Sequence, residues 1–162
     1  MPLERIGEGV RRDLVANEAA RKRIAHALDL VQVLRLQAKV EVRPRPLGGV
    51  VAGQLSATVV QTCGVSLEAF ETEVTAKFEA PYTTAPLSDP DPREELGLAD
   101  LDQPDFIKDG VIDLGQYVVE HLALELDPFP RKPGVTFEPP AAEKEPGAFD
   151  KLAQLHLKPA ND

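Results

Sequence analysis

The single cysteine of the chain is the residue best suited to covalent chemistry. Cys63 would act as a nucleophile in its thiolate form if a histidine lay beside it as a general base, and the chain offers His26, His121 and His156. None of these is near Cys63 in sequence, and the residues around Cys63 do not form a nucleophile elbow. Free cysteines are usually buried as small apolar side chains. We therefore predict that Cys63 is buried beside the Gly64 turn and that the chain has no catalytic residue.

Two patterns could bring metal ligands together, and both are incomplete. His121 and Glu125 are four residues apart, which puts two ligands on one helix face, but no third ligand accompanies them. Residues 105–116 resemble part of a calcium-binding loop, but the third position is Ile107 and the twelfth is Gln116, where a bidentate Glu is needed. The sequence therefore predicts neither a metal site nor a cofactor.

Basic side chains are concentrated in the first third of the chain. Residues 1–60 hold 10 basic and 6 acidic groups, whereas residues 61–130 hold 3 and 16, a separation that suggests two different kinds of neighbour. The basic third could bind RNA phosphates if its helix lies near the solvent face of its first strand; ordinary surface charge is the alternative. No interleaved aromatic residue supports base stacking. The candidate RNA-binding residues are Arg21, Lys22, Arg23, Arg35, Lys39, Arg43 and Arg45.

Acidic side chains dominate the middle of the chain. A solvated loop is one interpretation of this stretch, and a docking surface for a basic protein is the other, because opposite charge steers association. The candidate protein-binding residues are Glu94, Glu95, Asp100, Asp102 and Asp105.

Length and composition limit the class of protein. The chain has 162 residues, a formal net charge of -9 and one cysteine. A length near 160 residues fits one domain that buries about 70% of its unfolded surface. One cysteine excludes an internal disulfide and a cysteine-rich zinc site, and no apolar run reaches the roughly 18 residues that span a bilayer. We expect a soluble cytoplasmic protein whose net charge argues against nonspecific nucleic-acid binding by the whole surface.

A helix and three strands are expected in the first half. An asparagine N-cap begins a helix over residues 17–28, whose apolar residues recur at helical spacing. Over residues 32–43 apolar residues recur at every second position, which predicts a strand with one buried face and one mostly basic face. A Pro/Gly turn at 44–49 leads to a second strand over 51–60, and a third strand with an acidic outer face covers 70–79. Adjacent strands without room for crossover helices favour an antiparallel meander.

The second half contains a loop, a helix and a tail. Residues 81–109 lack apolar periodicity and predict a long acidic, proline-rich loop. Asp113 begins a helix that extends to residue 125, and Gln116 three residues later completes a capping-box pattern. Residues 135–162 are expected to form a flexible tail with a short helix at 148–157.

These elements predict the α+β class for a single domain over residues 1–134. We expect an antiparallel sheet meander of at least three long strands, open or curled toward a barrel, with two to three helices that cover its apolar face.

The order of motifs along the chain resembles the YceD family, described as large ribosomal RNA subunit accumulation proteins. The similar segments run from a strand that ends at Cys63, through an acidic loop, to an Ile-Asp-Leu helix start and a proline exit, and the resemblance covers about residues 4–134. The family-motif residues are Cys63, Phe70, Asp109, Asp113, Glu120, Pro128 and Pro130.

This resemblance implies a non-enzymatic bacterial factor that supports accumulation or processing of large-subunit (23S) ribosomal RNA. Its expected partners are a precursor of that RNA or an assembly intermediate, and a basic ribosomal protein or assembly factor. The alternative is an acidic protein-binding adaptor or chaperone that never contacts RNA. The resemblance supplies no catalytic residue, and many family members have further cysteines that this chain lacks.

Overall fold

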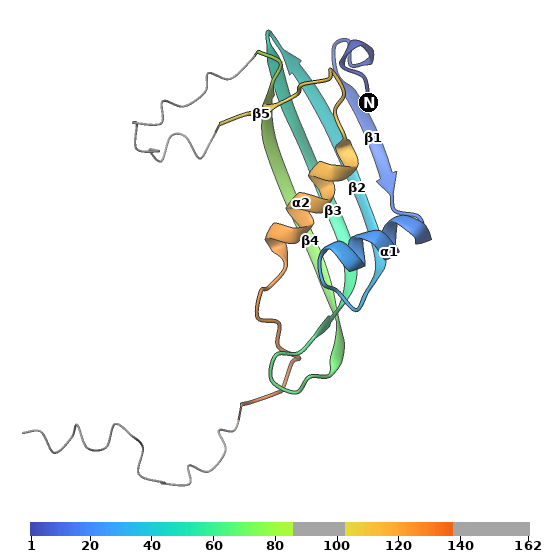
Figure 1. The fold of residues 1–162 in the computed structure, drawn as a ribbon, viewed down its shortest axis with the longest axis vertical. Coiled ribbons are helices and arrows are strands. Elements are labelled where there is room, and N and C mark those ends of the chain that lie inside the picture. Colours follow the sequence, from blue (N-terminus) through green and yellow to red (C-terminus); the bar gives the residue numbers. More distant parts are fainter. Residues whose placement is uncertain (86–102, 138–162) are drawn as a thin grey trace, which may run out of the picture.

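The computed structural model of the chain describes residues 1–85 and 103–137 as a curved sheet with two helices on one of its faces (Figure 1). The strand order is β1-β2-β3-β4-β5. In chain order the elements are the 3-10 helix η1 (Leu3–Arg5), β1 (Val10–Val15), α1 (Glu18–Ala27), β2 (Gln32–Arg45), β3 (Gly48–Thr62), β4 (Ala69–Thr83), β5 (Asp105–Phe106) and α2 (Leu114–Glu125).

The three long strands β2, β3 and β4 form because their sequences alternate between apolar and polar residues. Each pairs antiparallel with the next, so that Val40, Gly53 and Phe78 lie in one row across the face that the helices cover. Their neighbours in sequence point to the opposite face. The predicted strands and their buried faces are therefore confirmed, with each strand a few residues longer than expected.

The turn between β2 and β3 is shorter than the sequence predicts. Pro44 lies within β2 opposite Gly49, and Arg45 still pairs with Gly48, so that only Pro46 and Leu47 form the turn. Leu47 takes a positive φ of 61° to complete it.

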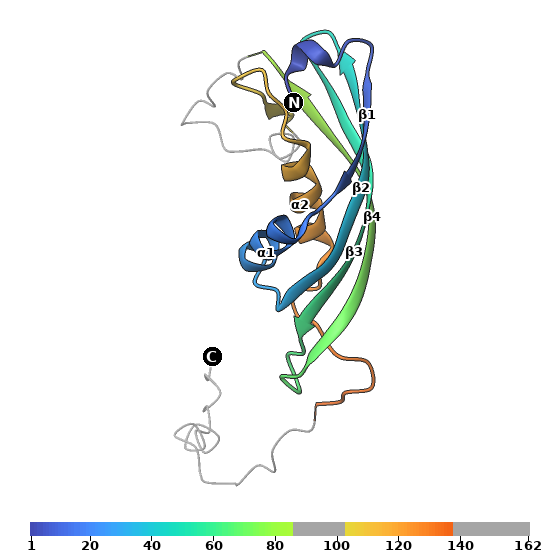
Figure 2. The same ribbon diagram turned by 90° about the vertical axis from the view of Figure 1, so that its right-hand side faces the viewer.

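Both helices begin at the predicted caps and cover the same face of the sheet (Figure 2). The Asn17 carboxamide oxygen accepts from the backbone N–H of Ala20 at 2.9 Å, which satisfies a free donor of the first turn of α1. Helix α2 buries one apolar stripe, and this stripe packs on β3 and β4. The stripe consists of Leu114, Tyr117, Val118 and Leu122.

The predicted capping box of α2 forms only by half. Asp113 Oδ1 accepts from the backbone N–H groups of Gly115 at 2.9 Å and Gln116 at 3.2 Å. The Gln116 side chain does not return to the cap; instead it donates to Glu120 Oε1 at 2.8 Å, one turn further along the helix. An i,i+4 acceptor on the same helix face competes with the cap for this amide.

The α+β class is confirmed, but the sheet is mixed and open. β1 to β4 are antiparallel, whereas β5 pairs parallel to β4 through Tyr82–Asp105 and Thr83–Phe106. Within the described residues β1 and β5 are the edges, so the sheet does not close into a barrel. The segment predicted as a loop at 81–109 therefore carries strand structure at both of its ends.

The N-terminus ties the start of the chain to the segment before α2. The Met1 amino group donates to the Ile112 carbonyl oxygen at 2.5 Å, and the Ile112 N–H donates to the Met1 carbonyl oxygen at 2.8 Å. Leu3 N–H also donates to the Gly110 carbonyl oxygen at 2.8 Å. These bonds satisfy the backbone around Ile112, which is fully buried.

Among residues 1–85 and 103–137, no helix is long and apolar enough to cross a membrane.

Candidate functional site

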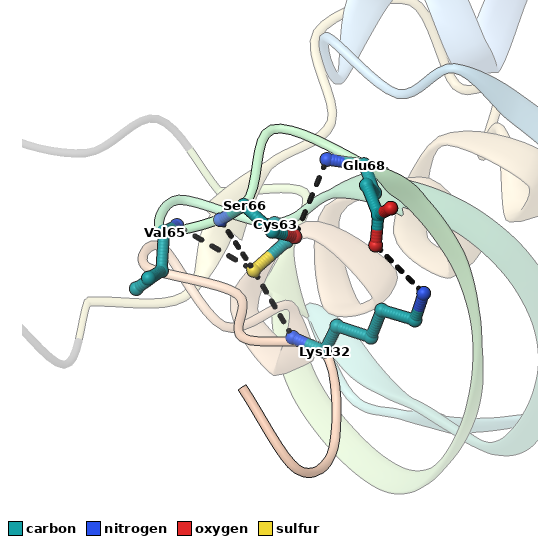
Figure 3. A network of polar contacts seen from close by, with 5 residues as sticks. All are labelled: Cys63, Val65, Ser66, Glu68 and Lys132. Carbon is teal, nitrogen blue, oxygen red and sulfur yellow. Dashed lines mark hydrogen bonds and ion pairs between the residues drawn. The ribbon is translucent and has the colours of Figure 1, made fainter. Parts of the chain in front are cut away.

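The loop between β3 and β4 is built around the sulfur of Cys63. Cys63 is fully buried, and its Sγ accepts from the backbone N–H groups of Val65 and Ser66, each at 3.4 Å (Figure 3). The Cys63 N–H in turn donates to the Glu68 carbonyl oxygen at 2.9 Å. The loop therefore folds its own backbone donors around the sulfur, because a tight turn leaves them without strand partners.

A segment distant in sequence completes this arrangement. The backbone N–H of Lys132 donates to Cys63 Sγ at 3.3 Å, and the Lys132 ammonium group pairs with Glu68 Oε2 at 2.8 Å (Figure 3). Gly64 N–H donates to the Pro130 carbonyl oxygen at 2.9 Å. These three contacts, which we call the Cys63 clasp, hold the chain after α2 against the β3–β4 loop.

The clasp favours the thiolate form of its cysteine. Hydrogen bonds from Ser66, through its hydroxyl and its backbone N–H, and from the backbone of Lys132 and Val65 lower the pKa of Cys63 to about 6, while burial opposes them. The Lys132 ammonium group lowers the pKa of Glu68, and Glu68 raises that of Lys132. The prediction of a buried cysteine beside Gly64 is confirmed, but the sulfur is a hydrogen-bond acceptor rather than an apolar filler.

No base lies at the sulfur within the described residues. His26 and His121 form no hydrogen bond to Cys63 Sγ there, and His156 lies outside the part of the chain that the structure describes. Across residues 1–85 and 103–137, no group of three potential metal ligands comes together.

The seven basic candidate residues separate into two groups on opposite sides of the sheet. Arg35, Lys39, Arg43 and Arg45 are exposed on β2, and their alternation with buried residues places them on the face that neither described helix covers (Figure 2). The other three lie on α1, which packs on the opposite face. The helix is therefore not beside the solvent face of the strand, the arrangement that a single RNA-binding surface would need.

Ion pairs already occupy part of each group. On the open face, Arg43 approaches Glu79 Oε2 at 3.7 Å. On α1, Lys22 pairs with Glu18 at 2.7 Å, and Arg21 Nη1 donates to the Ala16 carbonyl oxygen at 3.1 Å. Arg23 faces a groove of about 510 Å³ between α1 and α2. Within the described residues, Arg35, Lys39 and Arg45 are the β2 cations that form no ion pair.

Charge changes sign across the open sheet face. β2 presents four cations among its outward residues, namely Arg35, Lys39, Arg43 and Arg45, and β1 adds Arg11, which pairs with Glu41 of β2 at 3.0 Å. The outward residues of β3 are uncharged, and those of β4 are mostly acidic. The outward β4 carboxylates are Glu71, Glu73 and Glu79. One helix-free face therefore combines a basic strand with an acidic strand, separated by β3.

The predicted acidic docking residues can be placed only in part. Asp105 is exposed on β5, and together with burial, the dominant effect, it raises the pKa of Tyr117. The remaining four, Glu94, Glu95, Asp100 and Asp102, lie outside the described residues.

The family-motif residues have structural positions of several kinds. Phe70 is half-buried near the start of β4, and Asp109 is exposed in the turn before α2. Glu120 accepts the hydrogen bond from Gln116, and Asp113 caps α2. Pro128 and Pro130 line a cleft of about 600 Å³ with residues of the α1–β2 turn and the end of β3.

Two features of this region were not predicted from the sequence. His121, which the sequence offered only as half of an incomplete metal pair, is half-buried, and its ring stacks on that of Phe78 with centroids 4.4 Å apart. Gln61, which no sequence pattern singled out, is buried on β3 and lines the same cleft as the two prolines. Both contacts join segments far apart in the chain, so local patterns carry no signal for them.

Comparison with known protein families identifies the chain. Residues 51–155 match the family model described as large ribosomal RNA subunit accumulation protein YceD. The matched region includes the Cys63 clasp, β4, α2 and most of β3. No curated protein and no solved structure matched the chain in the corresponding searches.

The chain therefore belongs to the YceD family, as its motif order indicated. The family description supports a general role in ribosome biogenesis through accumulation of the large-subunit RNA.

Proposed function

We propose that the protein is a non-enzymatic binding factor that supports accumulation of large-subunit ribosomal RNA by joining precursor RNA to a basic protein. The observation that carries this proposal is the open sheet face, where β2 presents cations and β4 presents carboxylates. The cations of β2 attract RNA phosphates, and the carboxylates of β4 attract basic side chains.

The RNA contact is assigned to β2 rather than to α1. Arg35, Lys39 and Arg45 are exposed and lack ion-pair partners in the described residues, so they can neutralise phosphates without first breaking an internal contact. Lys22 is already paired, and the Arg21 guanidinium already donates to a backbone carbonyl. A face with about three available cations binds RNA weakly and with strong salt dependence.

The protein contact is assigned to the acidic strand β4. Glu71 and Glu73 are exposed on the open face and form no ion pair within residues 1–85 and 103–137. Their charge favours a basic ribosomal protein or assembly factor, mainly through the rate of association.

Two measurements in cells test the proposal. Deletion of the gene should lower the amount of large-subunit RNA relative to small-subunit RNA, and the tagged protein should co-sediment with large-subunit precursors at low salt. Normal RNA levels together with no co-sedimentation would refute the proposed function.

A protein-directed adaptor without RNA contact is the second candidate, and the acidic β4 side chains favour it. Replacement of Arg35, Lys39 and Arg43 by Glu separates the two candidates. The adaptor predicts unchanged partner binding and unchanged RNA levels, whereas the RNA-binding factor predicts loss of co-sedimentation and reduced large-subunit RNA.

A further inference from the structure

A cleft of about 600 Å³ lies where both helices end over the sheet. The turn after α1 and the exit of α2 lie over the same part of the sheet (Figure 1). Three segments form the cleft: the α1–β2 turn, the end of β3, and the last turn of α2 with the chain after it. The residues that line it are Leu28, Asp29, Leu30, Val31, Gln61, Thr62, Ala123, Leu126, Asp127, Pro128 and Pro130.

The cleft is electronegative. Asp29 and Asp127 are exposed at its rim, and no Lys, Arg or His is among its lining residues. Each carboxylate follows the C-terminus of a helix, where the helix dipole is already negative, and the last turn of α2 contains no basic residue. Acidic residues are unfavourable at these positions for helix stability, so they concentrate negative charge without a structural benefit from the dipole.

Asp29 occupies a position where glycine is usual. The Leu30 N–H donates to the Ala25 carbonyl oxygen at 2.9 Å, the bond of a Schellman motif, and Asp29 has a φ of 52°. The motif fixes the backbone at Asp29 and so the place from which its carboxylate projects. On the other side, Asp127 Oδ1 accepts from the Phe129 N–H at 2.8 Å, which orients that carboxylate.

A largely buried side chain without a protein partner is the second observation that points to a ligand. Gln61 is 7% exposed, lies on the helix-covered side of β3 and lines the cleft. Its side chain forms no hydrogen bond to any described residue, and its amide atoms are not among the fully enclosed polar atoms that lack a partner, so they are accessible from the cleft. This amide is therefore free to bond a polar group that enters the cleft.

We propose that this cleft binds the side chain of an arginine from a basic protein partner. A guanidinium offers five donors in one plane, enough for the carboxylates of Asp29 and Asp127 and the Gln61 carbonyl oxygen together. The apolar walls at Leu30 and Leu126 suit the aliphatic stem of the arginine. A lysine ammonium is more strongly hydrated and has fewer donors, so it fits this set of acceptors less well.

The inference deepens the proposed function, on which it rests for taking the arginine from a protein partner. It places a specific anchor beside the Cys63 clasp, because Pro130 belongs to both the clasp and the cleft. The acidic strand would then attract the basic partner, and the cleft would hold one of its side chains.

Titration of the isotope-labelled full-length protein with three peptides tests the proposal. The probes are acetyl-Gly-Arg-Gly-amide, its lysine counterpart and its citrulline counterpart, which has the shape of arginine without the charge. We expect a saturable NMR shift of the Gln61 side-chain amide with the arginine peptide. The lysine and citrulline peptides should bind about tenfold more weakly or worse, since charge-assisted bonds are lost or fewer.

Variants identify the groups responsible. Asp29→Asn with Asp127→Asn should weaken binding of the arginine peptide about tenfold or more. Asparagine tolerates positive φ at residue 29 and can still accept the Phe129 N–H at residue 127, so the fold is retained. The matched control, Glu4→Gln with Glu8→Gln, removes the same charge from exposed residues that do not line the cleft and should leave the affinity unchanged.

Several results would overturn the proposal: equal affinity for the citrulline or the lysine peptide, no shift of the Gln61 amide, or equal weakening by the control variant. The titration contains no RNA and no ribosomal component. A failed peptide titration would therefore not contradict the proposed function in RNA accumulation. Conversely, normal large-subunit RNA in cells that lack the gene would not contradict arginine binding in the cleft.

Discussion

Gly53 is a position at which an added methyl group should disturb the core between the sheet and α2. It lies on the buried face of β3 between Val40 and Phe78. A Cβ at residue 53 would lie 2.6 Å from Phe78 Cζ and 2.9 Å from the backbone oxygen of Lys39. The Phe78 ring has no room to retreat, because it is 7% exposed and stacks on His121 of α2. Gly53→Ala should therefore push α2 away from the sheet.

The size of the effect follows from two opposing contributions. Overpacking of a dense core costs about 1–3 kcal/mol. Alanine regains roughly 0.5–1 kcal/mol over glycine within a strand, because it loses less backbone entropy on folding. We expect a net loss of about 0.5–2 kcal/mol in the free energy of unfolding, measured by urea denaturation with an unchanged slope.

Gly64→Ala is the matched control for this experiment. A Cβ there would meet only the Pro130 carbonyl oxygen at 3.7 Å, an ordinary contact, so we expect no loss of stability or a gain of about 0.4–1 kcal/mol. Phe78→Leu should reduce the cost of Gly53→Ala, because it removes the ring atoms that clash. The packing argument is wrong if Gly53→Ala and Gly64→Ala have the same effect, or if Phe78→Leu leaves the cost of Gly53→Ala unchanged.

Three further predictions concern the clasp and the helices. Because folding lowers the pKa of Cys63 to about 6 from an ordinary value of 9.0, its contribution to stability should be complete above pH 9 and lost as pH falls to 6. Urea midpoints between these pH values should show this trend, Cys63→Ser should flatten it, and a trend of opposite sign would contradict the clasp. Asp113→Ala should lower the free energy of unfolding by about 1 kcal/mol through loss of the two cap bonds, and Asp113→Asn by clearly less; equal losses would argue against capping. Lys132→Met should speed proteolytic cleavage after residue 130, and Arg131→Met should not, because Lys132 pairs with Glu68 whereas Arg131 forms no ion pair among the described residues; equal cleavage rates would contradict the ion pair.

Local patterns in the sequence predicted the elements whose stability is local. Alternation identified β2, β3 and β4 because each has one face buried along most of its length. Asn17 and Asp113 were identified as caps because a cap bonds within three residues of itself.

β1 and β5 could not be predicted, because pairing rather than pattern stabilises them. β1 contains Arg11, Arg12 and Asp13 at its centre and has no alternation that distinguishes it from a loop. It forms because β2 offers it an unpaired edge. β5 has only two residues, and its partner is the end of β4.

The candidate sites depend on contacts between distant residues. Lys132 reaches Cys63 across 69 positions, and the arginine cleft draws on segments near residues 29, 61 and 127. Sequence analysis identified Cys63 and the basic residues as candidates. It could not show that the basic residues of α1 and those of β2 lie on opposite faces of the sheet, and so it grouped them in one RNA-binding surface.

The salt dependence of RNA binding tests the central claim most directly. Binding of a labelled large-subunit precursor fragment should weaken as salt rises, and Arg35→Gln with Lys39→Gln and Arg45→Gln should reduce the slope of log affinity against log salt by about 2–3. The matched variant on α1, Arg21→Gln with Lys22→Gln and Arg23→Gln, removes the same charge and should leave that slope unchanged. An unchanged slope in the β2 variant, or equal reductions in both variants, would contradict RNA binding by the open sheet face.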